Sequence, residues 1–338
     1  HMKLAVIADT HFGVRLESSL FHDDMERFFT EIFFPYLIKH NIKQIIHCGD
    51  LFDNRKKIDV YSAKRARKYF FEQLIKYDIE MDVVAGNHDL YFRERSDVST
   101  LEELIDHYPN IRIYTAATDM RIGSTNVCYI PWINKTNRES TLKHIENTSA
   151  QIAFGHLAIV GYQLFAGQYA KEGDDPVTFE KFHHVYTGHF HHRHTRSNIT
   201  YVGSPTQHIW SDYMDTRGFH IFDADTMEME FVPNPYKMFA YVNYEDNLVD
   251  AGYAKYVRVN YGKVKSQHDF DAAIKQLEKE GRLVQTIPLK DTANTGINVE
   301  TMEINVEDTL SLIKSMVSEE KVYDRLASLY QKAQHEQR

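Results

Sequence analysis

Short apolar runs alternate with longer amphipathic stretches in the first third of the chain. The most continuous apolar runs, typical of strands buried on both faces of a sheet, are 3–8, 44–48, 81–85 and 111–114. The stretches 24–40, 60–77 and 99–107 carry apolar residues at helical spacing, and Pro35 should kink or divide the first of them. This alternation predicts an α/β layered fold.

The next part of the chain is richer in strands. Apolar runs recur at 127–130, 152–154, 184–186, 199–202 and 219–222. We expect these runs to form a second sheet that packs on the first. The predicted fold class is therefore α/β, with two mixed β-sheets packed as a sandwich and flanked by helices.

Pro233-Asn234-Pro235 is the best boundary signal, because two prolines around an asparagine resist both helix and central strand. We expect a first domain over residues 2–235. Residues 236–295 predict a small β-α-β capping domain. We expect residues 296–338 to form a linker and C-terminal helices. The final helix carries one apolar stripe, and the sequence shows no obvious core that would cover it.

Composition and charge exclude several classes of protein. No apolar run approaches the roughly 20 residues that a membrane-spanning helix needs. Cys48 and Cys128 form neither a metal-ligand spacing nor a disulfide framework. We therefore expect a globular cytoplasmic protein without membrane association. The net charge of -9 lacks the wholly basic surface of many nucleic-acid proteins, so any DNA contact must rest on local patches.

Short polar motifs follow the predicted strands. They are Asp9-Thr10-His11, Gly49-Asp50-Leu51-Phe52-Asp53, Gly86-Asn87-His88-Asp89, Gly155-His156 and Gly188-His189-Phe190-His191. Each combines a small or flexible residue with a side chain that can bind metal, and glycine permits the sharp turn that points the next side chain into a cleft. Because open α/β sheets collect ligand groups at strand ends, these motifs predict one common site.

The candidate metal ligands are a mixture of carboxylate, imidazole and amide side chains: Asp9, His11, Asp50, Asn87, His156, His189 and His191. Such donors suit manganese, iron or zinc. We expect Asp50 to bridge two ions through its two oxygens, at the separation of about 3.5 to 4 Å typical of two-metal centres. Taken singly, each motif has an ordinary alternative as a helix cap, a solvated histidine pair or a turn. Their combination favours the metal centre.

The motif series resembles the calcineurin-like metallophosphoesterase superfamily, whose members share a two-sheet sandwich and a dinuclear site. Within it, the chain is most similar to SbcD-type recombination and repair nucleases, including the phage nuclease subunit that works with an SMC-like ATPase. The likeness covers about residues 3–235 and is carried by Gly-Asn-His-Asp at 86–89, Gly-His-Phe-His at 188–191, Ile-Pro-Trp at 130–132, Tyr-Val-Gly-Ser-Pro at 201–205 and Arg-Gly-Phe at 217–219.

This resemblance implies two divalent ions, with Mn²⁺ as the expected metal and Mg²⁺ as the alternative. One ion would be held by Asp9, His11, Asp50 and His191, and the other by Asp50, Asn87, His156 and His189. The resemblance also implies that His88 is the catalytic acid. Cellular members carry histidine where this chain has Asp53, so we expect Asp53 to take a different part, orienting His88 or a water.

The implied activity is hydrolysis of DNA phosphodiester bonds, as an exonuclease or endonuclease in double-strand-break processing and recombination. Arg55, Lys56 and Lys57 directly follow the Asp53 loop and are candidates for phosphate contact, although charge runs are more often solvated surface. By the resemblance, the capping domain at 236–295 is expected to bind DNA, and in the family the C-terminal helices bind the coiled-coil root of the ATPase. We expect the same of residues 296–338, against the alternative that they pack on the small domain.

The family also commonly forms homodimers through helices of its N-terminal half. Phe28, Phe29, Phe33 and Phe34 would supply such a surface, or else belong to the core. Two other functions compete with the nuclease. A phosphomonoesterase or protein phosphatase of the same superfamily is disfavoured, because residues 49–55 lack the Asp-Arg-Gly continuation of Ser/Thr phosphatases. A non-catalytic DNA-binding subunit is disfavoured by the complete set of ligands.

Overall fold

The structure is a computed structural model that describes residues 2–165, 167–246 and 251–289. The first sheet has the strand order β14-β13-β1-β2-β3-β4. Its strands are β1 (Lys3–Ile7), β2 (Gln44–His47), β3 (Glu80–Val84), β4 (Ile111–Tyr114), β13 (Gly218–Asp223) and β14 (Glu228–Pro233). The strands β1, β2, β3 and β4 run parallel to one another, whereas β13 runs antiparallel to β1 and to β14.

The second sheet also has six strands, in the order β11-β12-β10-β7-β6-β5. They are β5 (Thr118–Ile122), β6 (Thr125–Ile130), β7 (Ile152–His156), β10 (His184–Gly188), β11 (His194–Arg196) and β12 (Ile199–Tyr201). The central strands β6, β7, β10 and β12 are parallel, and the edge strands β5 and β11 are antiparallel. A separate hairpin joins β8 (Gln163–Phe165) to β9 (Gln168–Tyr169).

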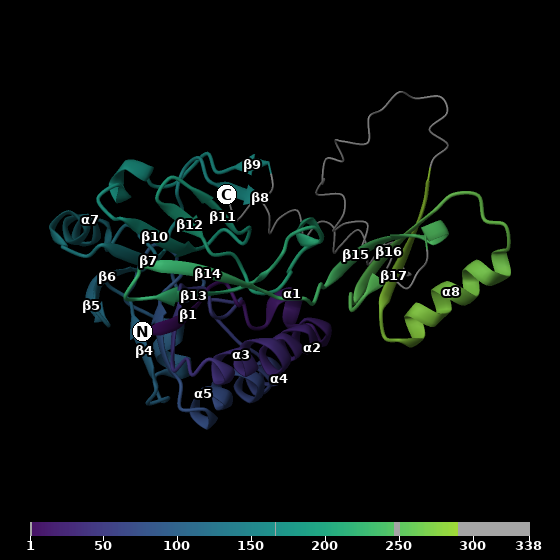
Figure 1. Cartoon of the computed structure of the whole chain (residues 1–338), viewed down its shortest axis with the longest axis horizontal. Helices are drawn as coiled ribbons and strands as arrows, with labels where there is room; N and C mark the ends of the chain where they lie inside the picture. Colours follow the sequence, from purple (N-terminus) through teal and green to yellow (C-terminus); the bar gives the residue numbers. More distant parts are fainter. Residues whose placement is uncertain (1, 166, 247–250, 290–338) are drawn as a thin grey trace. The chain divides into compact units, whose positions relative to one another are not determined.

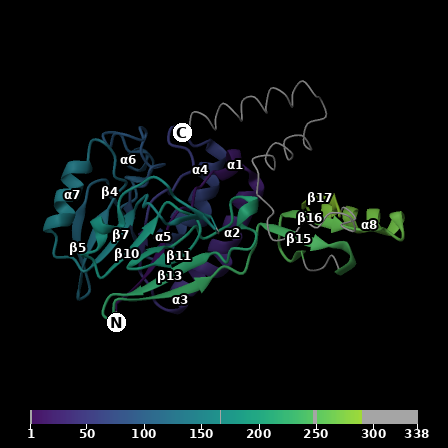
Figure 2. The same ribbon diagram turned by 90° about the horizontal axis from the view of Figure 1, so that it is seen from above.

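Helices cover the outer faces of the two sheets (Figure 1). They are α1 (Val14–Glu17), α2 (Ser19–Phe28), α3 (Phe34–Lys39), α4 (Val60–Ala66), α5 (Glu72–Lys76), α6 (Thr100–Ile105) and α7 (Arg138–Asn147). Short 3-10 turns cover Pro176–Phe179, Trp210–Asp212 and Tyr244–Asp246. Helices α2 to α5 lie together on the side of the first sheet, whereas α7 lies beside β5, β6 and β7 of the second sheet (Figures 1 and 2).

Strand β1 shows why the predicted strands are continuously apolar. Its side chains alternate between two cores, because successive residues of a strand point to opposite faces of the sheet. Leu4 and Val6 contribute to the core between the two sheets. Ala5 and Ile7 contribute to the core between the first sheet and its helices. The structure confirms the predicted sandwich of two mixed sheets flanked by helices.

The helix predicted over residues 24–40 is divided, as Pro35 suggested. A π-helical segment, Phe29–Phe33, separates α2 from α3, and Pro35, which has no N–H to donate to the preceding turn, lies at the start of α3. Phe28, Phe29 and Phe33 are fully buried and Phe34 is 2% exposed. These four side chains are therefore core residues, and they do not offer a surface for a dimer.

One strand lies in a different sheet from the one that the sequence predicts. Residues 219–222 were expected in the second sheet, but they belong to β13, which pairs antiparallel with β1 of the first sheet. The alternation of burial explains the error. Phe222 faces the core between the sheets and Phe219 faces the helices, so the apolar run is compatible with either sheet.

Beyond β14, a three-stranded parallel sheet has the order β15-β16-β17. It consists of β15 (Phe239–Asn243), β16 (Tyr256–Tyr261) and β17 (Leu283–Pro288), with helix α8 (Gln267–Lys279) between the last two strands. The predicted β-α-β unit is present, and β15 adds a strand that was not predicted. The boundary at residue 235 stays a prediction, and the predicted C-terminal helices lie outside the described residues.

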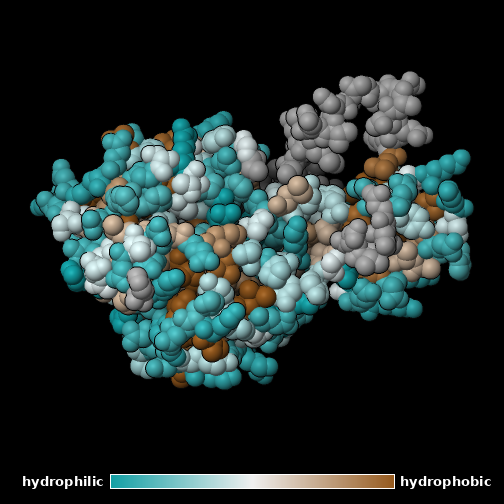
Figure 3. Space-filling view, in the orientation of Figure 1, coloured by the Kyte–Doolittle hydropathy of each residue, from teal (hydrophilic) through white to brown (hydrophobic). Residues whose placement is uncertain are grey.

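No membrane-spanning helix was predicted from the sequence. Among the residues that the structure describes, no helix is long and apolar enough to cross a membrane. The face shown in Figure 3 is mostly hydrophilic, with hydrophobic residues gathered toward its middle.

Candidate metal centre

All seven predicted ligands come together at one edge of the sandwich. Parallel strands carry their carboxyl ends to the same edge, so residues that follow them meet there although they are far apart in the sequence. Asp9 and His11 follow β1, Asp50 follows β2, Asn87 follows β3, His156 ends β7, and His189 and His191 follow β10.

Asp9, His11 and His191 form the first ligand set. Their donor atoms lie within 4.8 Å of one another. His11 Nε2 is 3.0 Å from His191 Nε2, and Asp9 Oδ1 is 3.8 Å from the first nitrogen and 3.9 Å from the second. A point equidistant from these three atoms lies about 2.1 Å from each, which is the usual length of a metal–nitrogen or metal–oxygen bond.

Asp50, Asn87, His156 and His189 form the second ligand set. Asn87 Oδ1 lies 3.0 Å from His156 Nε2 and 2.9 Å from His189 Nδ1. His156 Nε2 is also 3.4 Å from Asp50 Oδ2. The amide oxygen of Asn87 is thus oriented toward the same space as the two imidazole nitrogens and the carboxylate.

Asp50 joins the two sets through a single oxygen. Its Oδ2 lies 3.6 Å from His11 Nε2 in the first set and 3.4 Å from His156 Nε2 in the second. Its Oδ1 accepts the backbone N–H of His88 at 2.8 Å. The sequence led us to expect a bridge through both oxygens. The structure differs because the turn after β3 uses the other oxygen to hold the carboxylate in place.

The backbone is strained where it presents the ligands. Asp9, His11, Asp50 and His189 have φ angles of 53°, 46°, 56° and 100°. Residues other than glycine pay about 1 to 3 kcal/mol each for such conformations, which persist only where the surroundings enforce them. Gly86 is required for lack of space rather than for its backbone conformation. A Cβ at this position would lie 2.3 Å from Asp50 Oδ1. Any larger residue would displace the bridging carboxylate.

The centre attracts positive charge. Burial opposes ionisation of Asp50, but His156 and His88 outweigh it and hold the pKa of Asp50 well below its ordinary value. Burial would also lower the pKa of His156, but Asp50 outweighs burial and raises it to about 9. The pKa of His11 is likewise raised to about 9, against burial, by the carboxylates of Asp53 and Asp50. The buried carboxylate of Asp50 thus favours positive charge beside it, and with the converging donor atoms the residues present fit divalent metals.

His88 and Asp53 lie beside the first ligand set. The His88 ring is 5.0 Å from the His11 ring, and His88 Nδ1 donates a short hydrogen bond to the backbone carbonyl of Asp53. The Asp53 carboxylate faces the other ring, with Oδ1 3.2 Å from His11 Nδ1. Asp53 therefore bonds to His88 through its main chain, while its carboxylate also lies within 4.8 Å of a ring nitrogen of His88.

The three basic residues after Asp53 differ in their surroundings. Arg55 is half-buried, donates from Nε to the carbonyl of Asn87 at 2.7 Å, and ties the loops after β2 and β3 together. Lys56 and Lys57 are exposed, their backbone N–H groups bond to the Asn54 side chain, and Lys56 Nζ lies 5.6 Å from the Tyr91 ring. Lys56 and Lys57 thus extend from the loop, whereas Arg55 supports a ligand.

Asp89 has a structural role in the centre that the sequence did not predict. It is fully buried, and its carboxylate accepts backbone N–H groups of Asp50 at 2.7 Å, Gly86 at 2.8 Å and Leu51 at 3.0 Å. It therefore fixes the loops that present Asp50 and Asn87. The Gly-Asn-His-Asp motif contains this residue, but a turn-favouring aspartate carries no signal of long-range acceptance.

Arg217 supports the opposite side of the centre. This side chain is 2% exposed and donates to the carbonyl of His191 and to Ser204 Oγ. Its charge is balanced by Asp212 at 2.8 Å and Asp215 at 3.2 Å. Arg217 thereby fixes the backbone of the candidate ligand His191. The sequence motif Arg-Gly-Phe does not reveal this role by itself.

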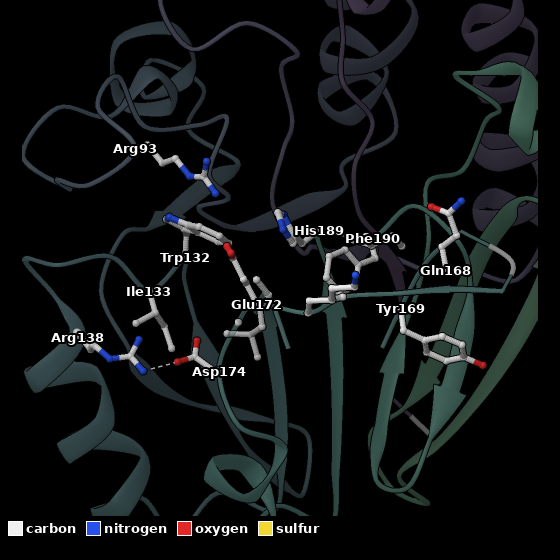
Figure 4. Close-up of a pocket in the computed structure, with 16 residues that line it drawn as sticks. Arg93, Trp132, Ile133, Arg138, Gln168, Tyr169, Glu172, Asp174, His189 and Phe190 are labelled. Atoms are coloured by element: carbon white, nitrogen blue, oxygen red, sulfur yellow. Dashed lines mark hydrogen bonds and ion pairs between the residues drawn. The ribbon is translucent and has the colours of Figure 1, made fainter. Parts of the chain in front are cut away.

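A cavity of about 890 Å³ opens beside the second ligand set and includes His189 in its lining (Figure 4). Trp132 and Arg93 lie on one side of His189, and Tyr169 lies on the other. The Trp132 ring is 5.0 Å from the His189 ring, and Arg93 Cζ is 5.8 Å from the Trp132 ring. Trp132 is 8% exposed, and its indole Nε1 has no hydrogen-bond partner among the described residues.

Comparisons with known proteins give one family. The model of the calcineurin-like phosphoesterase family matches residues 2–196. Exonuclease subunit 1 of Enterobacteria phage T4 is 30% identical over 233 residues, which are 69% of this chain and 68% of that protein.

Two solved structures are more distant. An archaeal phosphodiesterase shares 15% identity, with a TM-score of 0.35 over 69% of this chain and 100% of the other. A dimetal phosphatase from Danio rerio shares 11% identity, with a TM-score of 0.44 over 70% of this chain and 97% of the other.

The family match covers more than half of the chain and includes every residue of both ligand sets. The relative from phage T4 independently covers more than two thirds of the chain. The family uses divalent metals, which agrees with the donor atoms that converge in the two sets. The chain therefore belongs to the calcineurin-like phosphoesterase family.

Proposed function

We propose that this protein is a divalent-metal-dependent phosphodiesterase that cleaves DNA, as an exonuclease or endonuclease subunit in double-strand-break processing and recombination. The observation that carries the proposal is the position of Asp50 Oδ2, which lies within 3.6 Å of a ligand nitrogen in each of the two sets. A carboxylate that faces both ligand sets can serve two metal ions at the separation of about 3.5 to 4 Å that two-metal phosphoesterases use.

The proposed ligands divide as the family resemblance implies. Asp9, His11, Asp50 and His191 would hold one ion, and Asp50, Asn87, His156 and His189 would hold the other. When bound, two divalent cations supply Lewis-acid stabilisation of the phosphoryl oxygens and lower the pKa of water. Imidazole, carboxylate and amide donors without thiolate suit manganese, iron or zinc, and the family resemblance makes Mn²⁺ the proposed metal, with Mg²⁺ as the alternative.

His88 is the proposed proton donor to the leaving oxygen. Its Nδ1 must carry hydrogen, because it donates to the carbonyl of Asp53. The neutral ring therefore presents an unprotonated Nε2, and it acts as an acid only after that nitrogen takes up a proton. Burial lowers the pKa of His88 against the opposing effect of Asp50. A bound phosphodiester would supply the negative charge that favours protonation of Nε2.

A nucleotide substrate is supported by the cavity beside His189. Its volume of about 890 Å³ lies within the range of cavities that bind small-molecule ligands and cofactors. Trp132 offers an aromatic face and Arg93 offers a cation next to it, which are the groups that stack on bases and contact phosphates. Lys56 and Lys57 extend the basic surface from the loop after β2. The choice of DNA rests on the likeness to a phage exonuclease subunit.

The proposed partner is an SMC-like coiled-coil ATPase, bound through the C-terminal residues 296–338. This part of the proposal draws support from the name of the phage relative, which is a subunit of a larger enzyme. A homodimer is also proposed from the resemblance. Because Phe28, Phe29, Phe33 and Phe34 are buried, the dimer surface must be formed by other side chains.

The test uses end-labelled linear duplex and single-stranded DNA with Mn²⁺, Mg²⁺ or EDTA. We expect cutting that requires Mn²⁺ and falls by about 100-fold or more in Asp50→Asn, because even outer-sphere partners of a metal cost 10- to 100-fold. Asp78→Asn is the matched control, since Asp78 is an exposed aspartate away from both ligand sets. His88→Ala should lose about 100-fold or more in rate while it keeps the metals.

Two outcomes would contradict the proposal in different ways. Cutting that persists in Asp50→Asn would show a contaminating nuclease. Absence of cutting by the wild type, together with hydrolysis of para-nitrophenyl phosphate, would indicate a phosphomonoesterase instead. If neither substrate is hydrolysed, the same assay repeated with the ATPase partner decides between a dependent nuclease and a non-catalytic DNA-binding subunit.

A further inference from the structure

A second cluster of metal-binding side chains lies on the far strands of the second sheet. It consists of Asp119 on β5, Cys128 on β6 and His144 on α7. Their ligand atoms lie within 4.8 Å of one another. None of the three belongs to the motifs of the phosphoesterase centre, and their spacing along the chain does not suggest a metal site.

The fold explains how the three residues meet. Asp119 and Cys128 are directly opposite each other in the antiparallel pair β5–β6, so their side chains point to the same face of the sheet. That face is covered by α7, whose buried Ile145 belongs to the same hydrophobic core as Cys128. His144 lies in the last turn of α7 and reaches Asp119, with Nε2 2.9 Å from Oδ1.

We propose that Asp119, Cys128 and His144 bind a zinc ion, which fastens the edge hairpin β5–β6 to the end of α7. A thiolate, an imidazole and a carboxylate are a typical zinc donor set, and a water would complete four-coordination. The thiolate excludes the harder ions Mn²⁺ and Mg²⁺, which prefer oxygen. The site therefore differs in metal preference from the phosphoesterase centre, which contains no thiolate.

The distances require only small movements. Nitrogen and oxygen ligands of tetrahedral zinc are about 3.3 Å apart, and nitrogen and sulfur ligands about 3.5 Å apart. His144 Nε2 and Asp119 Oδ1 need to separate slightly from 2.9 Å, while Cys128 Sγ needs to approach from at most 4.8 Å. The Asp119 and His144 side chains are 46% and 31% exposed, so both have room to rotate.

The protons can be accounted for. Burial raises the pKa of the Cys128 thiol, so the ion displaces a proton that leaves to solvent as the sulfur–zinc bond forms. The hydrogen between His144 Nε2 and Asp119 moves to Nδ1, which leaves Nε2 as a ligand. Thr148 Oγ1 donates to Asp119 at 2.7 Å and keeps the carboxylate oriented.

One nearby cation opposes binding. The charge of Lys181 acts on Cys128, but Lys181 Nζ is engaged by the carbonyls of Glu146 at 2.9 Å and Thr148 at 2.7 Å. Its charge favours the thiolate over the thiol and repels the incoming ion. The three ligands supply two negative charges once the thiol is deprotonated, which outweighs a single ammonium group.

The test is a Co²⁺ titration of the full chain, followed by absorbance. Cobalt replaces zinc, and a thiolate ligand adds a sulfur-to-cobalt charge-transfer band in the near ultraviolet that nitrogen and oxygen ligands do not produce. We expect this band in the wild type and its displacement by Zn²⁺. It should be lost in Cys128→Ser, and His144→Ala should need at least 10-fold more Co²⁺ to produce it.

His107→Ala is the matched control for the histidine change, because His107 is exposed and outside the cluster. The fully buried Cys48 is the other cysteine, so a band that survives in Cys128→Ser would overturn the assignment. A wild type without the band at saturating Co²⁺, or an unchanged titration of His144→Ala, would overturn it as well. Zinc content after dialysis gives a second measurement, with one ion fewer expected in both ligand variants if they fold.

Discussion

Replacing Asp89 with alanine should destabilise the protein by leaving three buried N–H groups without an acceptor. The Asp89 carboxylate accepts from Asp50, Gly86 and Leu51 at distances of 2.7 to 3.0 Å, and it is fully buried. These bonds join the loop after β2 to the turn after β3. Loss of Asp89 should therefore affect both stability and the geometry of the two ligand sets.

The magnitude follows from the number of donors. A buried donor without a partner costs about 1 to 3 kcal/mol, and water that enters the space left by the carboxylate recovers part of this. For three donors we expect Asp89→Ala to lower the free energy of unfolding by about 3 to 5 kcal/mol. Asp89→Asn retains one oxygen, which still accepts from Asp50 and Gly86. Its amide NH2 would face the Leu51 N–H, and because both groups are donors, only this one hydrogen bond is lost. Its loss should be only about 1 to 2 kcal/mol.

Urea unfolding followed by circular dichroism, with EDTA present, measures both variants without a contribution from bound metal. The same proteins are then compared in DNA cleavage with Mn²⁺, where Asp89→Ala should lose more activity than Asp89→Asn. The reasoning would be refuted if Asp89→Ala changed the free energy of unfolding by less than about 1 kcal/mol, or if both variants lost the same amount.

Two further predictions concern buried charges. Arg217→Met should cost about 3 to 5 kcal/mol in urea unfolding, because it leaves Asp212 and Asp215 without their cation; a loss below about 1 kcal/mol would argue against the ion pairs. Burial raises the pKa of Asp24 to about 7, from 3.8 in the unfolded chain, so its contribution to stability is complete below pH 3.8 and is lost as the pH rises through 7. The difference in free energy of unfolding between Asp24→Asn and the wild type should therefore change in favour of the variant as the pH rises from 4 to 8. A difference that stays constant across this range would contradict the pKa shift.

Much of the metal centre was predictable because its residues follow strands. A buried strand is visible as an apolar run, and glycine or asparagine with a metal-binding side chain marks the turn after it. Asp9, Asp50 and Asn87 were assigned on this basis. The structure brings them together as expected, but it gives the contact with both sets to one oxygen of Asp50. That detail depends on the His88 N–H, which no sequence pattern encodes.

Supporting residues were harder to predict because they act through contacts between distant segments. Arg55 was considered a phosphate ligand from its place in a basic run, but its side chain bonds to the carbonyl of Asn87. Arg217 reaches the carbonyl of His191 across 26 residues of sequence. In each case the sequence identifies the basic side chain. Its partner is a backbone carbonyl, and only the folded chain defines where that carbonyl lies.

The sequence by itself determined the α/β sandwich, the positions of the main strands along the chain and the identity of the converging candidate ligands, since these depend on local periodicity and on residue type at strand ends. Tertiary structure decided the rest. It assigned β13 to the first sheet, buried the phenylalanines between residues 28 and 34, and placed Asp119, Cys128 and His144 in one cluster. The physical reason is that strand pairing and helix packing join residues far apart in the chain, and apolar or polar character alone does not specify the partner.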